Sequence, residues 1–164
     1  MKLVGCLHYS GVFWNLVEKG AFMLSNFNFD NMYDILLDEK NRIAIPKKDR
    51  SILKNSSSGE IVIFLRNNGC LNICPYSVWE KIADKVQKNE KNMQIRKKIL
   101  HMKHKTKIDS QGRISVPKTL RILANILTRE MTLIGIGDKF ELWSSDALAE
   151  DLSKSSSDDY IDGV

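Results

Sequence analysis

Apolar and polar residues alternate in two similar segments of the chain, residues 37–53 and 108–124. Each segment begins with an apolar residue and an Asp, continues with polar residues that favour a turn, and then alternates apolar and polar positions after an Arg. Alternation with a period of two on both sides of a turn predicts a strand, a tight turn and a second strand. A Pro follows in each segment, and its fixed φ suits the start of a helix. Each segment therefore predicts a strand–turn–strand–helix unit.

The two segments align without a gap, which indicates an internal duplication. Six pairs match, each 71 residues apart: Asp38 with Asp109, Arg42 with Arg113, Ile43 with Ile114, Ile45 with Val116, Pro46 with Pro117, and Arg50 with Arg121. In the turns, Gly112 suits a positive φ, and Asn41 at the matching place is the next most tolerant residue type. A chain of 164 residues is long enough for two such repeats to share one hydrophobic core.

The remaining residues predict an α+β protein that is mostly β. Further strands are expected at residues 61–65, 71–75, 131–136 and 140–143, and helices at 47–54, 93–101, 118–127 and after Ser144 or Ser145. Another helix is expected after Ser77, because residues 77–80 match the capping-box pattern in which Ser and Glu satisfy the first backbone N–H groups. Asn67, Asn68 and Gly69 predict the turn of a hairpin.

The chain divides into five parts by composition and repetition. These are an N-terminal extension outside the fold (1–22), a first repeat (32–78), a helical basic linker (79–102), a second repeat (103–146) and a disordered acidic tail (153–164). The apolar runs of the extension are too short and too interrupted to span a membrane. Met23 offers an alternative start, so we expect residues 1–22 to lie outside the working fold.

Charge points to a polyanionic partner. The formal net charge is +5 and the sequence pI is about 9.1. Residues 87–107 contain eight Lys or Arg against one acidic residue, Glu90. That stretch is either a solvated helix surface, which is the more common case, or a surface that gathers phosphate backbone. Three cysteines, an odd number, do not indicate a disulfide framework, which favours a reducing compartment such as the cytoplasm.

The duplicated D-x-x-x-R motif, followed by I-x-I/V-P and a second Arg, resembles the MraZ family of bacterial transcriptional regulators, which contain two SpoVT/AbrB-like repeats. Supporting segments lie after each motif, at residues 70–73 with Pro75 and Trp79, and at residues 133–135 and 140–144. The resemblance covers roughly residues 23–152. Asn41 departs from the pattern, because the family usually has Gly there, and residues 1–22 have no counterpart.

The resemblance implies a fold of duplicated swapped-hairpin β-barrel repeats that form a pseudo-dimer within one chain. It also implies a ring-like homo-oligomer that binds short direct repeats in the double-stranded DNA of a promoter, usually its own, upstream of the division and cell-wall gene cluster. The protein would then repress or tune that promoter in the cytoplasm, at the nucleoid. We expect no enzymatic activity, no cofactor and no small-molecule substrate. We also expect no membrane partner.

Five basic residues are candidates for DNA contact: Lys40, Arg42, Lys47, Lys48 and Arg113. Arg can pair bidentately with guanine, and Lys adds charge that positions the backbone. For Arg42 we favour DNA contact over a structural pair with Asp38, whereas for Arg113 we favour a role in the fold or a subunit interface. Structural roles are expected for Asp38, Asn41, Pro46, Asp109, Gly112 and Pro117, and also for Arg50 and Arg121.

Three alternatives to this function remain. The first is an AbrB-like antitoxin, although such antitoxins usually carry one copy of the motif and dimerise. The second is a metal-dependent enzyme that uses Cys70, Cys74, His101 and His104, although 26 residues separate the two pairs, which exceeds common zinc-site spacing. The third is a ring-forming scaffold whose basic surface binds a protein. The sequence contains neither a phosphate-binding G-x-x-x-x-G-K-[ST] loop nor a G-x-S-x-G nucleophile motif.

Overall fold

The computed structural model describes residues 29–66 and 68–155, which form an α+β fold of antiparallel sheets and helices. The first half contains β1 (Met32–Leu36), β2 (Arg42–Ala44), α1 (Lys47–Asn55), the short 3-10 helix η2 (Ser57–Gly59), β3 (Glu60–Leu65), β4 (Leu71–Pro75) and α2 (Tyr76–Asn89). The second half contains α3 (Met93–Leu100), β5 (Lys103–Lys107), β6 (Arg113–Ser115), α4 (Lys118–Leu123), β7 (Glu130–Gly135), β8 (Phe140–Trp143) and α5 (Ser145–Ser155). The predicted α+β class is therefore confirmed. The expectation that the fold is mostly β is wrong, because the helices contain more of the described residues than the strands do.

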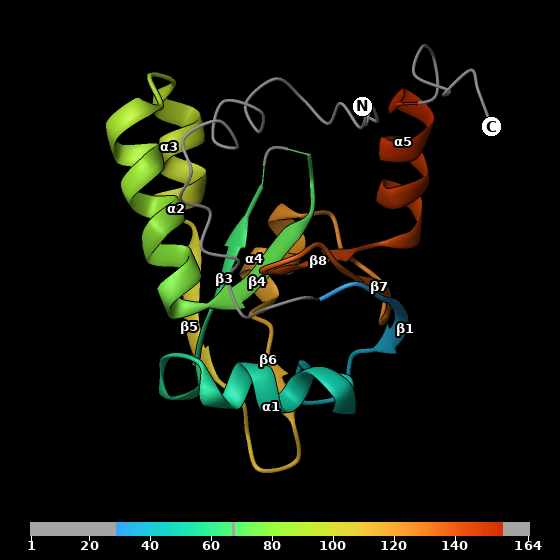
Figure 1. Ribbon diagram of the computed structural model, residues 1–164. Coiled ribbons are helices and arrows are strands. Elements are labelled where there is room, and N and C mark those ends of the chain that lie inside the picture. The colour runs from blue at the N-terminus through green and yellow to red at the C-terminus, as the bar shows by residue number, and fades with distance from the viewer. Residues whose placement is uncertain (1–28, 67, 156–164) are drawn as a thin grey trace, which may run out of the picture.

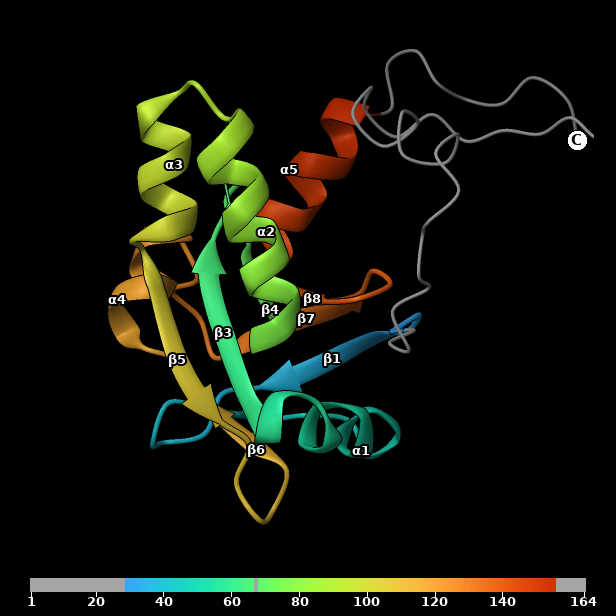
Figure 2. The same cartoon turned by 60° about the vertical axis from the view of Figure 1, so that its left-hand side comes forward.

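The strands of the two repeats interleave in one sheet. Its order is β1-β7-β8-β4-β3-β5, and Figures 1 and 2 show these strands. The remaining strands, β2 and β6, pair with each other in a two-stranded ribbon. Equivalent strands are β1 and β5, β2 and β6, β3 and β7, and β4 and β8. Exchanging each strand for its equivalent leaves this order unchanged when it is read from the other end. The duplication in the sequence thus corresponds to a two-fold relation within the chain.

The motif strands pair with the opposite repeat. In the first repeat, Asp38 N donates to Arg42 O at 2.8 Å and Asn41 N donates to Asp38 O at 3.0 Å, so the predicted turn forms. Beyond the turn, however, β1 pairs with β7 and β2 pairs with β6. The strand–turn–strand unit expected in the first repeat, which would pair residues 32–37 with 43–45 as a hairpin, is therefore wrong in its pairing. Ile43 of β2 is buried against the other repeat, whereas Tyr33 and Ile35 of β1 are only partly buried where they pack against the same core.

The β2–β6 ribbon covers the main core. In its register Ile43 lies directly opposite Ile114, and both side chains are buried together with Ile45 and Val116. They pack with the inner residues of the six-stranded sheet in one cluster. A smaller cluster on the other face of β3 and β4 packs against α2 and α3. Strands β1 and β5 are the two edges of this sheet, so no closed barrel is detected among the described residues.

Helix starts follow proline. Pro46, Pro75 and Pro117 occupy the N-cap positions of α1, α2 and α4, with φ between −54° and −59°. The capping box predicted at Ser77 is wrong, because α2 already begins at Tyr76 and the backbone N–H of Ser77 donates to the Ser57 hydroxyl at 3.0 Å.

Helix ends differ from the predictions at two places. The structure ends α4 at Leu123 and not at residue 127, because Asn125 adopts a left-handed φ of 54°. At the other end of the chain, α5 continues to Ser155, three residues into the predicted tail. The remainder of that tail, the extension at residues 1–22 and the predicted turn residue Asn67 lie outside the described residues. None of the helices in the described part of the chain has the length and hydropathy needed to cross a bilayer.

Candidate nucleic-acid interface

The register of the β2–β6 ribbon places the two motif arginines on one face. Arg42 is opposite Ser115 and Arg113 is opposite Ala44. Because side chains alternate across a strand, these four residues lie on the face opposite the buried isoleucines. Both arginine side chains are about a quarter exposed, at 25% and 28%. The ribbon therefore presents two guanidinium groups on the outside of a sealed core.

Each turn is organised by its Asp. In the first turn, Asp38 Oδ1 accepts from the backbone N–H groups of Lys40 at 2.9 Å and Arg42 at 2.8 Å, and Asp38 Oδ2 accepts from Arg42 Nε at 2.8 Å. The second turn repeats this pattern: Asp109 Oδ1 accepts from Gln111 N and Arg113 N, and Asp109 Oδ2 accepts from Arg113 Nε at 2.9 Å. The D-x-x-x-R spacing thus lets one carboxylate bind the turn backbone and the Arg side chain together.

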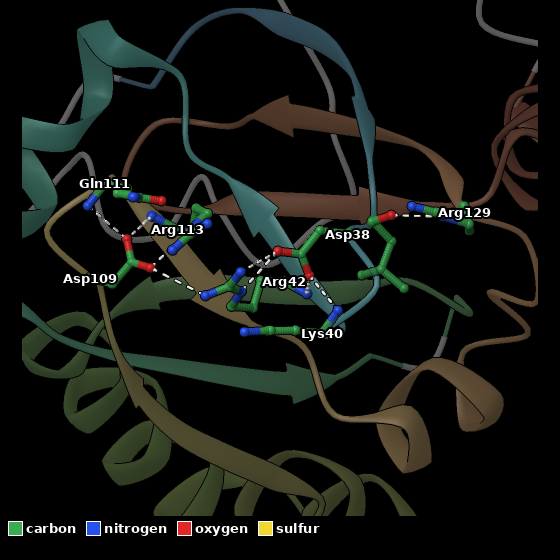
Figure 3. A network of polar contacts seen from close by, with 8 residues as sticks. Asp38, Lys40, Arg42, Asp109, Gln111, Arg113 and Arg129 are labelled. Carbon is green, nitrogen blue, oxygen red and sulfur yellow. Dashed lines mark hydrogen bonds and ion pairs between the residues drawn. The ribbon is translucent and has the colours of Figure 1, made fainter.

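The two Asp–Arg pairs meet at the centre of the ribbon, and the four residues form what we call the Asp–Arg quartet. Arg42 lies between both carboxylates, with Nη2 at 2.7 Å from Asp38 Oδ2 and Nη1 at 3.8 Å from Asp109 Oδ2 (Figure 3). The contact of Arg113 with Asp109 runs through Nε. The two repeats are therefore not equivalent at this site. Arg42, the arginine expected to contact DNA, is the one held by two acids, so the structural pair with Asp38 is present in this structure.

A second pair of arginines, one on each of two helices, contacts the two turns. Arg121 of α4 is buried, and its Nη2 donates to Asn41 Oδ1 in the first turn at 2.7 Å. Arg50 of α1 donates through Nε to Ile45 O at 2.7 Å and lies directly beneath Gly112 in the second turn. Each helix arginine thus contacts the turn of the other repeat. This bracing was not predicted, although the equal spacing of Arg50 and Arg121 was the signal that could have indicated it.

The lysine candidates lie around this ribbon in different settings. Lys40 is exposed at the tip of the first turn, and Lys47 is exposed at the first residue of α1. Lys48 Nζ forms an exposed ion pair with Asp30 Oδ1 at 2.9 Å. Arg129 Nε donates to the carbonyl oxygen of Leu37 at 2.9 Å and so fixes the start of the first turn (Figure 3). The structure brings together the four residues of the Asp–Arg quartet and the backbone of Lys40, whereas Lys47 and Lys48 lie on α1 without a contact to the quartet.

Hydrogen bonds lower the pKa of both turn carboxyls. For Asp38 the main cause is the hydrogen bond from the Arg42 side chain, and for Asp109 it is the hydrogen bond from the Arg113 backbone N–H. A carboxyl whose pKa is lowered in the folded state stabilises the protein above its unfolded pKa, which is about 3.9 for Asp. That stabilisation is lost as the pH falls through the lower, folded-state pKa.

We therefore predict that the wild type is more stable than an Asp38→Asn/Asp109→Asn variant at neutral pH, and that this difference in stability is lost in acid. Thermal unfolding followed by circular dichroism should give a constant difference in Tm above about pH 5, because both carboxyls are then ionised in either state. The difference should shrink below about pH 4. A difference that stayed constant down to pH 2 would show that the two carboxylates do not contribute through ionisation.

Cys70, Cys74, His101 and His104 do not come together as metal ligands in the described part of the chain. Cys70 and Cys74 are buried beside or within β4, and burial raises the pKa of Cys70 and raises that of Cys74 to about 12, which keeps both as thiols. His104 lies on β5, and His101 is an exposed residue after α3. Across residues 29–66 and 68–155, no group of three or more His, Cys, Asp or Glu side chains is placed to hold a metal ion. The metal-dependent enzyme therefore lacks its ligand cluster in the described part of the chain.

Comparison with known proteins gives a consistent result. Residues 99–161 match the family model described as "MraZ protein, putative antitoxin-like". Three relatives, each named "Transcriptional regulator MraZ", come from Saccharophagus degradans, Marinobacter nauticus and Thioalkalivibrio sulfidiphilus, and are 32%, 34% and 37% identical to this chain over 124, 138 and 123 residues. Those alignments cover 73%, 80% and 72% of this chain and 84%, 91% and 81% of the respective relatives.

Proposed function

This chain belongs to the MraZ family of transcriptional regulators, and we propose that it regulates transcription by binding promoter DNA through the outer face of the β2–β6 ribbon. The family is not enzymatic. The Asp–Arg quartet carries the proposal, because it places two arginines on one outward face above a rigid, buried support. Arginine is the side chain best suited to reading guanine edges in the major groove.

The quartet orients both arginine side chains before DNA binds. Each arginine is held by the carboxylate four residues earlier, and each turn is held by an arginine from the other repeat. A side chain that is already oriented loses less conformational entropy on binding. The interface then consists of Arg42, Arg113, Lys40, Lys47 and Lys48, with the two Asp residues as orienting groups. Contact with DNA requires the guanidinium groups to share or exchange their carboxylate partners.

The finer features of the family are part of the proposal. We propose two swapped-hairpin repeats, residues 32–78 and 103–146, that form a pseudo-dimer within the chain, and the interleaving of the strands supports this proposal. One chain offers few contacts, so several copies in a ring-like homo-oligomer would bind direct repeats of DNA by effective concentration. The promoter of the protein's own division and cell-wall gene cluster is the expected target, and repression or tuning at the nucleoid is the expected outcome.

The test is a gel shift with the DNA upstream of this protein's own gene. The wild type should retard that duplex, and Arg42→Ala or Arg113→Ala should each weaken binding by about 1–3 kcal/mol, the value of one bidentate arginine–guanine contact. Arg66→Ala is the matched control, because it removes the same charge from the residue that follows β3, and that end of β3 lies away from β6 (Figure 1).

The variants must keep their oligomeric state, which size-exclusion chromatography checks. Retained affinity in both ribbon variants would move the DNA contact to another surface. A loss of affinity in Arg66→Ala equal to that in the ribbon variants would show that net charge alone governs binding.

The matched family model also carries the words "putative antitoxin-like", which keeps the antitoxin as a second candidate. Its partner would be a toxin encoded by a neighbouring gene. Co-expression with that neighbour, followed by affinity purification, would recover a stable complex if the antitoxin function holds. The duplicated motif favours the regulator, because antitoxins of this type usually carry a single copy.

A further inference from the structure

The Asp–Arg turns do not supply the net positive charge that DNA phosphates require. Residues 38–42 contain Asp38 and Glu39 against Lys40 and Arg42, and residues 109–113 contain only Asp109 and Arg113. Both turns are thus formally neutral. Non-specific affinity for DNA comes from cations that displace counterions from phosphates. Because the Asp–Arg quartet and its turns carry no net charge, DNA binding there needs a cationic surface close by.

Positive charge is concentrated in residues 76–107, which contain ten Lys or Arg and three Asp or Glu. Within this stretch, β5 contributes Lys103, Lys105 and Lys107 at alternate positions. Alternate residues of a strand point to the same side of the sheet. We call these three residues the β5 lysine row. Lys105 and Lys107 are exposed and Lys103 is half-buried.

Aromatic side chains of α2 fix part of this row. Lys103 Nζ lies 4.4 Å from the centre of the Trp79 ring, and Lys105 Nζ lies 3.8 Å from the centre of the Tyr76 ring. A cation above an aromatic face is held by the ring quadrupole and keeps donors for another partner. Lys107 Nζ is 3.9 Å from Oε1 of Glu60, the residue opposite it on the neighbouring strand β3. Each lysine of the row thus has a neighbouring side chain that restrains its position.

The β5 lysine row lies next to the Asp–Arg quartet along the chain. Strand β5 runs from the end of α3 to the loop before β6, while α2 and α3 lie at the opposite end of the molecule from that loop (Figures 1 and 2). Only Ile108 separates Lys107 from Asp109. At about 3.3 Å per residue the row spans about 13 Å. One DNA strand carries a phosphate every 3.4 Å or so along the helix axis, so the row is about as long as four phosphates.

We propose that the β5 lysine row is a second DNA-contacting surface, which binds the phosphate backbone beside the bases read by the Asp–Arg quartet. This inference rests on the proposed function and assigns a separate role in DNA binding to each of the two surfaces. The row supplies sequence-independent affinity, and the quartet supplies sequence dependence. Lys107 contacts the phosphates nearest the Asp–Arg quartet, and Lys103 contacts the most distant ones.

The test compares two variants with the same change in charge. The row variant is Lys103→Gln/Lys105→Gln/Lys107→Gln. The control variant is Lys81→Gln/Lys85→Gln/Lys88→Gln, which changes three exposed lysines of α2. Their spacing places them on one face of the helix, and that face points away from β5. Because Lys103 also donates to Leu100 O, a Lys105→Gln/Lys107→Gln variant covers the case in which the triple variant does not fold.

Binding is measured by fluorescence anisotropy with the duplex from upstream of the protein's own gene and with a scrambled duplex of equal length, over a range of salt concentrations. The row variant should lose affinity for both duplexes, and its log–log salt slope should become shallower by about 0.9 for each lost phosphate contact. The control variant should keep the wild-type slope.

Two results would overturn the inference while leaving the proposed function intact. In the first, the row variant matches the control variant although the wild type binds and Arg42→Ala or Arg113→Ala weakens binding. In the second, the row variant loses affinity for the native duplex only, which would make these lysines part of base reading. If the wild type binds neither duplex at low salt, the proposed function itself fails, and this inference fails with it.

Discussion

Ile43→Ala should lower the free energy of unfolding by about 2–5 kcal/mol, the usual range for truncating a fully buried isoleucine. Ile43 has 0% exposure and lies directly opposite Ile114, at 1%, on the inner face of the ribbon. The ribbon has only three residues in each strand, so few neighbours can move to fill the cavity. The same side chain thus seals the core and supports the guanidinium groups on the opposite face.

Urea denaturation followed by circular dichroism, at one fixed protein concentration, measures this effect. The matched control is Ile122→Ala on α4, because Ile122 is 54% exposed and its truncation should change stability by no more than about 0.5 kcal/mol. Equal midpoints for the two variants would mean that the ribbon does not close the core. Ile43→Ala should also weaken DNA binding, but only to the extent that folding is lost.

Local structure was largely predictable from the sequence, because it depends on neighbouring residues. The predicted strand at 140–143 coincides with β8, and the helix expected at 93–101 ends one residue early in α3. Ser144 caps the last helix as expected, with its Oγ accepting from the backbone N–H of Ala147. These elements are marked by turn residues, capping side chains or alternation that act over only a few positions.

The pairing of strands was not predictable in the same way. Alternation shows which face of a strand is buried, but not which strand covers it. Strands β1 and β2 are joined by a short turn, so pairing with each other was the simplest interpretation. The duplication offers each strand an equivalent partner in the other repeat, and the structure uses β7 and β6. Only the resemblance to a swapped-hairpin family pointed to that exchange.

The candidate site was predicted by residue type more successfully than by geometry. The sequence identified the Asp and Arg of both motifs, and the structure places all four in one network. It did not reveal that Arg42 lies between two carboxylates, nor that the turns are braced by Arg50 and Arg121. Such contacts depend on the relation between the repeats, which no local pattern encodes.

Gly112→Ala should destabilise the protein by about 2–5 kcal/mol in total, through two separate effects. Gly112 has a φ of +81°, which costs an alanine about 1–2 kcal/mol. A Cβ at this position would also overlap Nε and Cδ of Arg50. Moving Arg50 aside would break its hydrogen bond to Ile45 O, which costs about 1–3 kcal/mol for a part-buried carbonyl left without a partner.

A matched glycine separates the two effects. Gly69 has nearly the same φ, +84°, but an added Cβ there would have no atom within 4 Å, so Gly69→Ala should show the backbone cost alone. In a double-mutant cycle, Gly112→Ala in an Arg50→Ala background should cost no more than Gly69→Ala, because the overlapping side chain is absent. Urea midpoints of the four proteins give the coupling energy. Full additivity of Gly112→Ala and Arg50→Ala would show that Arg50 does not brace the second turn, and the cross-repeat support of the quartet would then rest on Arg121 alone.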